Sequence, residues 1–94
     1  MRQYELGEEK MRKINNRDDV IYEKIAANIK EQRKLANMTQ AELAEKSNYS
    51  HEFIRRIEAT KGKKYFSIDA LVKIARAMHV RVEILLKGIS DEEK

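Results

Sequence analysis

Between Thr39 and Thr60 the chain contains two short helical patterns separated by a break at residues 47–50 (SNYS). The break is notable because the 94-residue chain has no proline, the residue that most strongly interrupts a helix. Asn48 predicts a tight reversal here, since asparagine is the non-glycine residue that best tolerates the left-handed backbone conformation. Ser50 can then cap the second pattern with its hydroxyl group. The sequence therefore predicts two short helices joined by a tight turn.

The composition favours a small all-α domain. Only three residues are glycine and 38% are charged, and the chain has no cysteine for a disulfide or a thiolate metal site. The first ten residues lack the apolar region of a signal peptide, and no window approaches the roughly 18 apolar residues of a membrane span. We therefore expect a cytoplasmic protein without contact to a membrane, whose core is held by apolar packing.

Hydrophobic periodicity and capping residues divide the chain into an N-terminal arm or loose helix (1–19), one domain (20–89) and an acidic tail (90–94). Within the domain we expect five helices, over residues 20–36, the two turns after Thr39, and residues 51–59, 68–78 and 81–87. Thr39 opens the second helix with the capping box TQAE. The apolar residues expected to recur along one face of the fourth helix are Ile68, Leu71, Val72, Ala75 and Met78.

The positive charge is concentrated in one part of the chain. The net charge is +4, and residues 50–66 alone hold five basic and two acidic side chains. This distribution indicates a polyanionic partner such as DNA. A solvated charged surface without a partner would also account for it.

The segment TQAELAEKSNYSHEFIRRIE resembles the helix-turn-helix of the XRE family, the superfamily of phage repressors and Cro proteins. The positions that match the family pattern are Gln40, Leu43, Ala44, Ile54, Ile57 and Glu58. The resemblance extends over about residues 20–87 and implies a five-helix repressor-like (Cro/C1-type) domain. The chain departs from the family at Asn48, where glycine is usual, and at Tyr49, where a smaller aliphatic residue is usual. It also has Phe66 in place of the common proline before the fourth helix.

The resemblance also implies roles for individual side chains. It places Arg33 where the family has an arginine that pairs with the glutamate of the third helix, here Glu58, and we interpret this pair as structural. The residues expected to read DNA bases are Ser50, His51, Glu52, Arg55 and Arg56. The residues expected to bind phosphates are Thr39, Gln40, Lys61, Lys63 and Lys64.

Some of these roles have alternatives. Glu52 should either contact a base or pair with Arg55 or Arg56, since an isolated carboxylate is repelled by phosphates. Gln40 could be an ordinary surface residue, and the lysines could belong to a mobile loop. We expect Phe53 to be partly buried rather than to meet a thymine methyl group.

We therefore predict a transcriptional regulator, in the first place a repressor, that binds double-stranded DNA as a homodimer on a palindromic site. The dimer surface is expected to comprise Val80, Val82, Ile84, Leu86 and Ile89, although these residues could instead close the monomer core. The alternative function is an antitoxin that binds both operator DNA and a toxin protein, and a restriction-modification controller would have the same chemistry. We expect no enzyme, no cofactor and no metal, because His51 and His79 are isolated and the chain has no glycine-rich phosphate loop.

Overall fold

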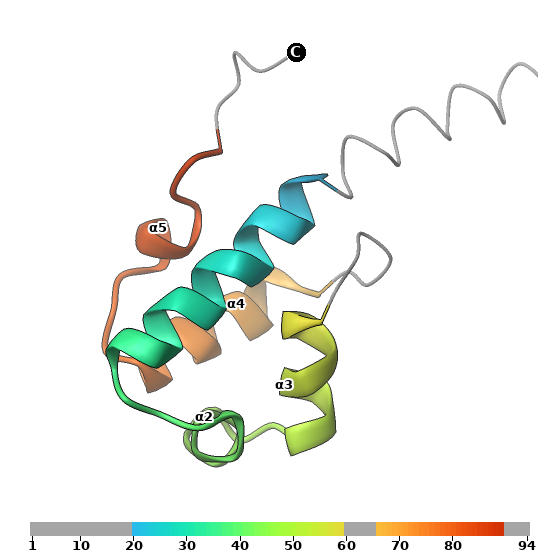
Figure 1. Cartoon of the computed structure of the whole chain (residues 1–94), viewed down its shortest axis with the longest axis vertical. Helices are drawn as coiled ribbons and strands as arrows, with labels where there is room; N and C mark the ends of the chain where they lie inside the picture. The colour runs from blue at the N-terminus through green and yellow to red at the C-terminus, as the bar shows by residue number, and fades with distance from the viewer. Residues whose placement is uncertain (1–19, 60–65, 90–94) are drawn as a thin grey trace, which may run out of the picture.

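The computed structural model describes residues 20–59 and 66–89, and every regular element in them is a helix (Figure 1). Residues 20–35 are helical, and they are followed by α2 (Gln40–Ser47), α3 (His51–Glu58), α4 (Ile68–Ala77) and α5 (Val82–Leu85). The five predicted helices are therefore present and the all-α class is confirmed. The predicted arm, the acidic tail and the loop lysines lie outside the described residues.

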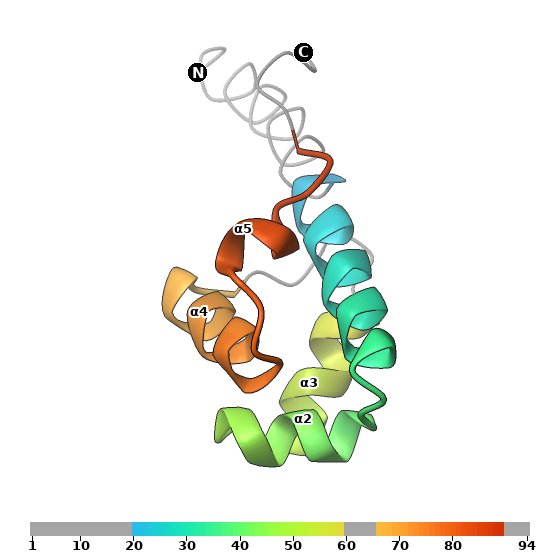
Figure 2. The ribbon, with the colours of Figure 1, turned by 90° about the vertical axis from the view of Figure 1, so that its left-hand side faces the viewer.

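The helix over residues 20–35 runs diagonally along the domain, and the other helices surround one side of it (Figures 1 and 2). α2 packs against both α3 and α4, and α4 packs against α5. In both views α2 and α3 lie together at the end of the domain away from α5. This arrangement leaves the outer side of the α2–α3 pair uncovered by the rest of the described chain.

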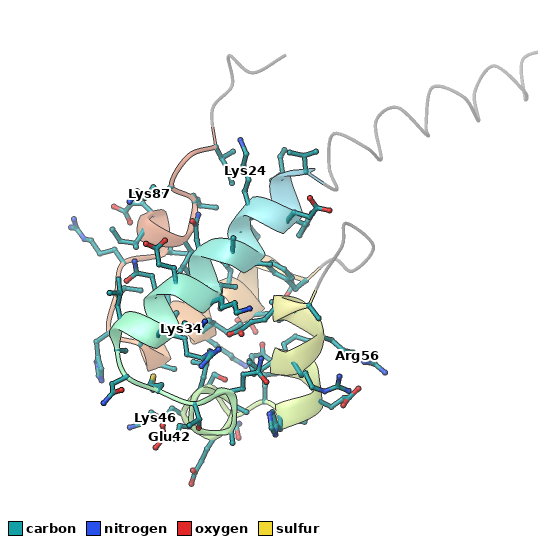
Figure 3. The ribbon with its side chains drawn as sticks, in the orientation of Figure 1. Lys24, Lys34, Glu42, Lys46, Arg56 and Lys87 are labelled. Atoms are coloured by element: carbon teal, nitrogen blue, oxygen red, sulfur yellow. The ribbon has the colours of Figure 1, made fainter. Side chains whose placement is uncertain are left out.

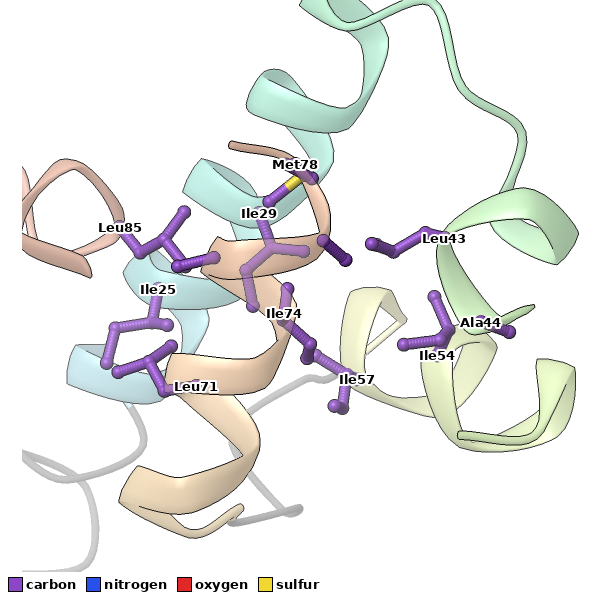
Figure 4. Packing of buried hydrophobic residues seen from close by; sticks show 12 residues of the cluster. Ile25, Ile29, Leu43, Ala44, Ile54, Ile57, Leu71, Ile74, Met78 and Leu85 are labelled. Atoms are coloured by element: carbon purple, nitrogen blue, oxygen red, sulfur yellow. The ribbon is translucent and has the colours of Figure 1, made fainter. Parts of the chain in front are cut away.

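Each of the five helices supplies one fully buried side chain to a single core (Figure 4). These side chains are Ile29, Leu43, Ile54, Ile74 and Leu85. Full burial of an aliphatic side chain of this size stabilises the folded state by about 1.5–3 kcal/mol. The core thus depends on contributions from distant parts of the chain, and α3 is anchored to it by Ile54 and Ile57.

The fourth helix differs from its prediction in which residues it buries. Ile68 was expected on the apolar face but is 75% exposed, whereas Ile74 is fully buried. The buried stripe comprises Leu71, Ile74, Ala75 and Met78, which follow one another at helical spacing. Ile68 is the first residue of α4 and lies one turn before this stripe, where none of the described helices covers it.

The fifth helix is shorter than predicted, with four residues in place of seven. The Asn28 amide from the first helix donates to the carbonyl oxygens of Leu85 and Lys87, both at 2.9 Å. These hydrogen bonds satisfy two carbonyl groups at and just after the end of the helix, where the intrahelical pattern of backbone donors stops. Gly88 then turns the chain with a φ of 85°.

Candidate DNA-binding surface

The turn between α2 and α3 is built as the sequence predicted. Asn48 ends α2 in the left-handed conformation, with φ 67° and ψ 34°. The Tyr49 N–H donates to the carbonyl oxygen of Ala44 at 2.9 Å, which closes the turn. The Ser50 hydroxyl then accepts from the Phe53 N–H at 3.0 Å and caps α3. Local hydrogen bonds therefore fix the direction in which α3 leaves the turn.

The two faces of α3 differ sharply in polarity. Ile54 and Ile57 face the core, while the polar side chains on the opposite side are exposed. These exposed side chains are His51, Glu52, Arg55 and Arg56. Figure 3 shows Arg56 extending from α3 away from the body of the domain. The helix thus presents hydrogen-bonding groups outward from a rigid support.

Phe53 lies between these two faces and is half-buried, as predicted. Its ring stacks on Tyr49, with centroids 4.4 Å apart and an interplanar angle of 28°. The Lys73 ammonium group lies 5.6 Å from the centroid of the Tyr49 ring. The aromatic residue at position 49 is therefore accommodated by packing on α3 and α4.

Arg33 and Glu58 join the first helix to the end of α3. Arg33 Nε donates to Glu58 Oε2 at 2.7 Å and Arg33 Nη2 donates to Oε1 at 3.0 Å. Arg33 Nη1 also donates to the carbonyl oxygen of Met38 at 2.7 Å. One guanidinium group therefore holds both α3 and the segment before α2 in place.

Gln40 extends this network toward the exposed end of α3. Its Nε2 donates to Glu58 Oε1 at 3.0 Å, and its Oε1 lies 3.4 Å from His51 Nε2. Gln40 is half-buried between α2 and α3 and is not an ordinary surface residue. Sequence reasoning missed both contacts. A signal for the contact with His51 is that Gln40 and His51 are each the first residue of their helix.

The Glu52 carboxylate is shared by the two arginines of α3. Glu52 Oε1 accepts from Arg55 Nη2 at 2.6 Å, and Oε2 accepts from Arg56 Nε at 3.1 Å. The hydrogen bond from Arg55, followed by that from Arg56, holds the pKa of Glu52 below its ordinary value. Of the two roles considered for this residue, the structure shows the ion pairs with arginine.

Two short helices, a tight turn and an exposed polar face on the second helix together make a helix-turn-helix. Residues 29–85, more than half of the chain, match the model of the helix-turn-helix family. The protein belongs to the helix-turn-helix family. As an XRE-type, or Cro/C1-type, member it is a DNA-binding transcription regulator. Comparison with curated proteins and with solved structures gives no significant match.

At the start of the helix-turn-helix, the Thr39 side chain is occupied by the capping box. Its hydroxyl accepts from the Glu42 N–H at 3.0 Å, and Glu42 Oε1 accepts from the Thr39 N–H at 2.8 Å. Thr39 and Gln40 therefore stand together at the N-terminus of α2, where the helix dipole favours an anion. The other residues expected to bind phosphates, Lys61, Lys63 and Lys64, lie outside the described part of the chain.

The residues expected to form a dimer surface fall into two groups. Val80, Val82 and Ile89 are half-buried and pack against the monomer core. Ile84 and Leu86 are 38% and 39% exposed. Part of the expected surface thus closes the core of the monomer, and Ile84 and Leu86 remain accessible around α5.

Two further features are absent from the described residues. Residues 20–59 and 66–89 contain no group of three His, Cys, Asp or Glu side chains that could hold a metal ion. No helix in these two ranges is long and apolar enough to span a bilayer.

Proposed function

We propose that this helix-turn-helix protein represses transcription by binding a specific palindromic operator as a homodimer. The observation that carries the proposal is the exposed polar face of α3, which holds Arg55 and Arg56 on a helix anchored in the core by Ile54. An α-helix fits the major groove of B-DNA, where each base pair has its own pattern of donors and acceptors. Arginine on such a helix can donate two hydrogen bonds to guanine.

The remaining polar residues of the surface are proposed to support this contact. Ser50 and His51 stand at the start of α3, where the side chains of a recognition helix meet base edges. The N-terminus of α2, with Thr39 and Gln40, is proposed to bind a phosphate and so to set the register on the duplex. Lys61, Lys63 and Lys64 are proposed to add phosphate contacts after α3.

A dimer is part of the proposal because one such module buries little surface on DNA. Two copies related by twofold symmetry place their recognition helices about 34–36 Å apart, one turn of the DNA helix. Ile84 and Leu86 are proposed for the interface because both are exposed apolar side chains next to the core.

Selection from random duplex DNA followed by sequencing tests the proposed DNA recognition. The wild type should enrich a palindrome, and the double variant Arg55→Ala, Arg56→Ala should lose the preference at particular base pairs. Each bidentate contact contributes about 1–3 kcal/mol of discrimination. The matched control is Arg76→Ala, Arg81→Ala, which removes two exposed arginines from outside the helix-turn-helix and should keep the palindrome.

If the wild type enriches no sequence, operator binding through α3 is rejected, and a role in binding a protein such as a toxin is favoured. Sedimentation of the wild type and of Ile84→Lys, Leu86→Lys tests the dimer. The wild type should sediment as a dimer and the variant as a folded monomer with weaker operator binding. A monomeric wild type, alone and on its operator, would reject the dimer.

A further inference from the structure

Outside the core of the domain, Glu52, Arg55 and Arg56 form a cluster joined by two ion pairs. Each carboxylate oxygen of Glu52 is used by a different arginine, at 2.6 Å for Arg55 and 3.1 Å for Arg56. The spacings are i,i+3 and i,i+4 with the acid nearer the N-terminus, which is the favourable order on a helix. One carboxylate therefore restrains both arginines of the recognition helix at once.

The cluster is accessible and charged. More than half of each of the three side chains is exposed, so a DNA duplex placed against α3 can reach all of them. A glutamate is already ionised at neutral pH, and the two arginine hydrogen bonds lower the pKa of Glu52 further. Glu52 thus restrains the arginines and offsets one of their two positive charges.

The hydrogen bonds to Glu52 do not exhaust the guanidinium donors. A guanidinium group has five N–H donors, and the bonds to Glu52 use Nη2 of Arg55 and Nε of Arg56. A guanine requires two donors, for its O6 and N7 atoms. The bond to Glu52 therefore does not prevent either arginine from contacting guanine.

A phosphate contact by the same arginines has a different consequence. Phosphates line the edges of the groove, so an arginine that turns to them leaves Glu52 or brings that carboxylate close to a second anion. Both changes are unfavourable, and both occur chiefly on DNA that offers no guanine at the right position.

Glu52 thus permits the arginines to contact guanine but opposes their contacts with phosphates. On the basis of the proposed function, we infer from this that Glu52 is a specificity-determining positioning residue. It holds Arg55 and Arg56 toward base edges and weakens their binding to phosphates of non-target DNA. The DNA target expected from this role is a duplex whose half-site carries guanine opposite these arginines. Glu52 acts through the arginines and does not itself read a base.

The test compares Glu52→Gln with Glu45→Gln, since each replaces one exposed glutamate by its neutral isostere. Glu45 lies on α2 and has no ion pair within the described residues. For both variants and the wild type, affinity is measured for the selected operator and for a random duplex over a series of salt concentrations. Base preferences are measured by selection and sequencing, and thermal unfolding verifies that each variant is folded.

Relative to Glu45→Gln, we expect Glu52→Gln to bind the random duplex about three- to tenfold more tightly, because two exposed ion pairs no longer restrain the arginines. The slope of log affinity against log salt should steepen by about 0.9 for each additional phosphate that the arginines bind. The guanine preference at the positions read by Arg55 and Arg56 should weaken. A purely structural role for Glu52 would change neither the slope nor the base preference.

Two results would overturn the inference. The first is a Glu52→Gln variant that matches Glu45→Gln in random-duplex affinity and salt slope. The second is loss of a cytosine preference with the arginine-dependent guanine preference intact, which would make Glu52 a direct reader of a base. If the wild type selects no sequence, the proposed function fails, and the random-duplex measurements still decide whether Glu52 restrains the arginines.

Discussion

Arg33 and Glu58 are 25 residues apart in the sequence, yet they form a two-pronged ion pair that is almost completely buried. The exposed fractions of their side chains are 10% and 2%. Glu58 also accepts a hydrogen bond from Gln40, so its carboxylate is bonded to side chains of both the first helix and α2. The pair ties α3 to the first helix of the domain.

Removal of either partner should therefore destabilise the protein strongly. We expect Arg33→Ala or Glu58→Gln to lower the free energy of unfolding by about 3 kcal/mol, since the remaining group is left buried without its counter-charge. Urea unfolding measures the change. Asp69→Asn is the control, because it breaks an exposed pair with Lys73 and should cost less than about 1 kcal/mol. Equal losses in the buried and exposed pairs would contradict the prediction.

The left-handed conformation at position 48 predicts which substitutions there preserve stability and which lower it. Asn48→Gly should leave stability unchanged or slightly raised, because glycine adopts the observed φ of 67° without strain. Asn48→Val should destabilise the protein by about 1–2 kcal/mol, because a β-branched side chain tolerates the left-handed conformation much less well than asparagine does. Thermal unfolding of the two variants checks this order. A stable valine variant would show that the turn can take another conformation.

Truncation of Ile54 and of Ile68 to alanine should lower the free energy of unfolding by very different amounts. Ile54→Ala should cost about 2–5 kcal/mol, because Ile54 is fully buried and its loss leaves a cavity under α3. Ile68→Ala should cost less than about 0.5 kcal/mol at its exposed position. Denaturant unfolding of both variants measures the difference. Similar losses would mean that Ile68 is covered by a part of the molecule beyond the described residues.

The Glu52 cluster predicts a specific dependence of stability on pH. Its pKa is lowered in the folded state, so its contribution is present above the ordinary pKa of a glutamate and is lost as the pH falls through the lowered value. The stability advantage of the wild type over Glu52→Gln should therefore be constant near neutral pH and should shrink as the pH falls below about 4.5, the ordinary pKa of a glutamate. Thermal unfolding at several pH values measures it, with Glu45→Gln as the control for loss of one carboxylate. An advantage independent of pH would contradict the assigned ion pairs.

The features that the sequence predicted are those set by neighbouring residues. The capping box at Thr39, the left-handed Asn48 and the cap at Ser50 each need only a few residues of context, and all three are present. The buried face of α3 was also predictable, since Ile54 and Ile57 follow helical spacing. For the same reason the existence of the five helices could be predicted.

The features that were missed depend on residues far away in the chain. Periodicity placed Ile68 on an apolar face, but it cannot show where the covering helix ends. The end of α5 depends on Asn28, which is 57 residues from Leu85. The contacts of Gln40 with Glu58 and His51 likewise arise only when α2 and α3 are packed together.

The buried network and the exposed face of α3 use largely different residues. Arg33, Glu58 and the isoleucines hold the helix in place, whereas the side chains of Glu52, Arg55 and Arg56 lie outside the core and are more than half exposed. Under the proposed function, substitutions at those three positions should therefore change which DNA sequence is preferred while the fold is kept. The domain is in this sense a stable scaffold for retargeting, and a library confined to the outer face of α3 is the place to look for new operator preferences.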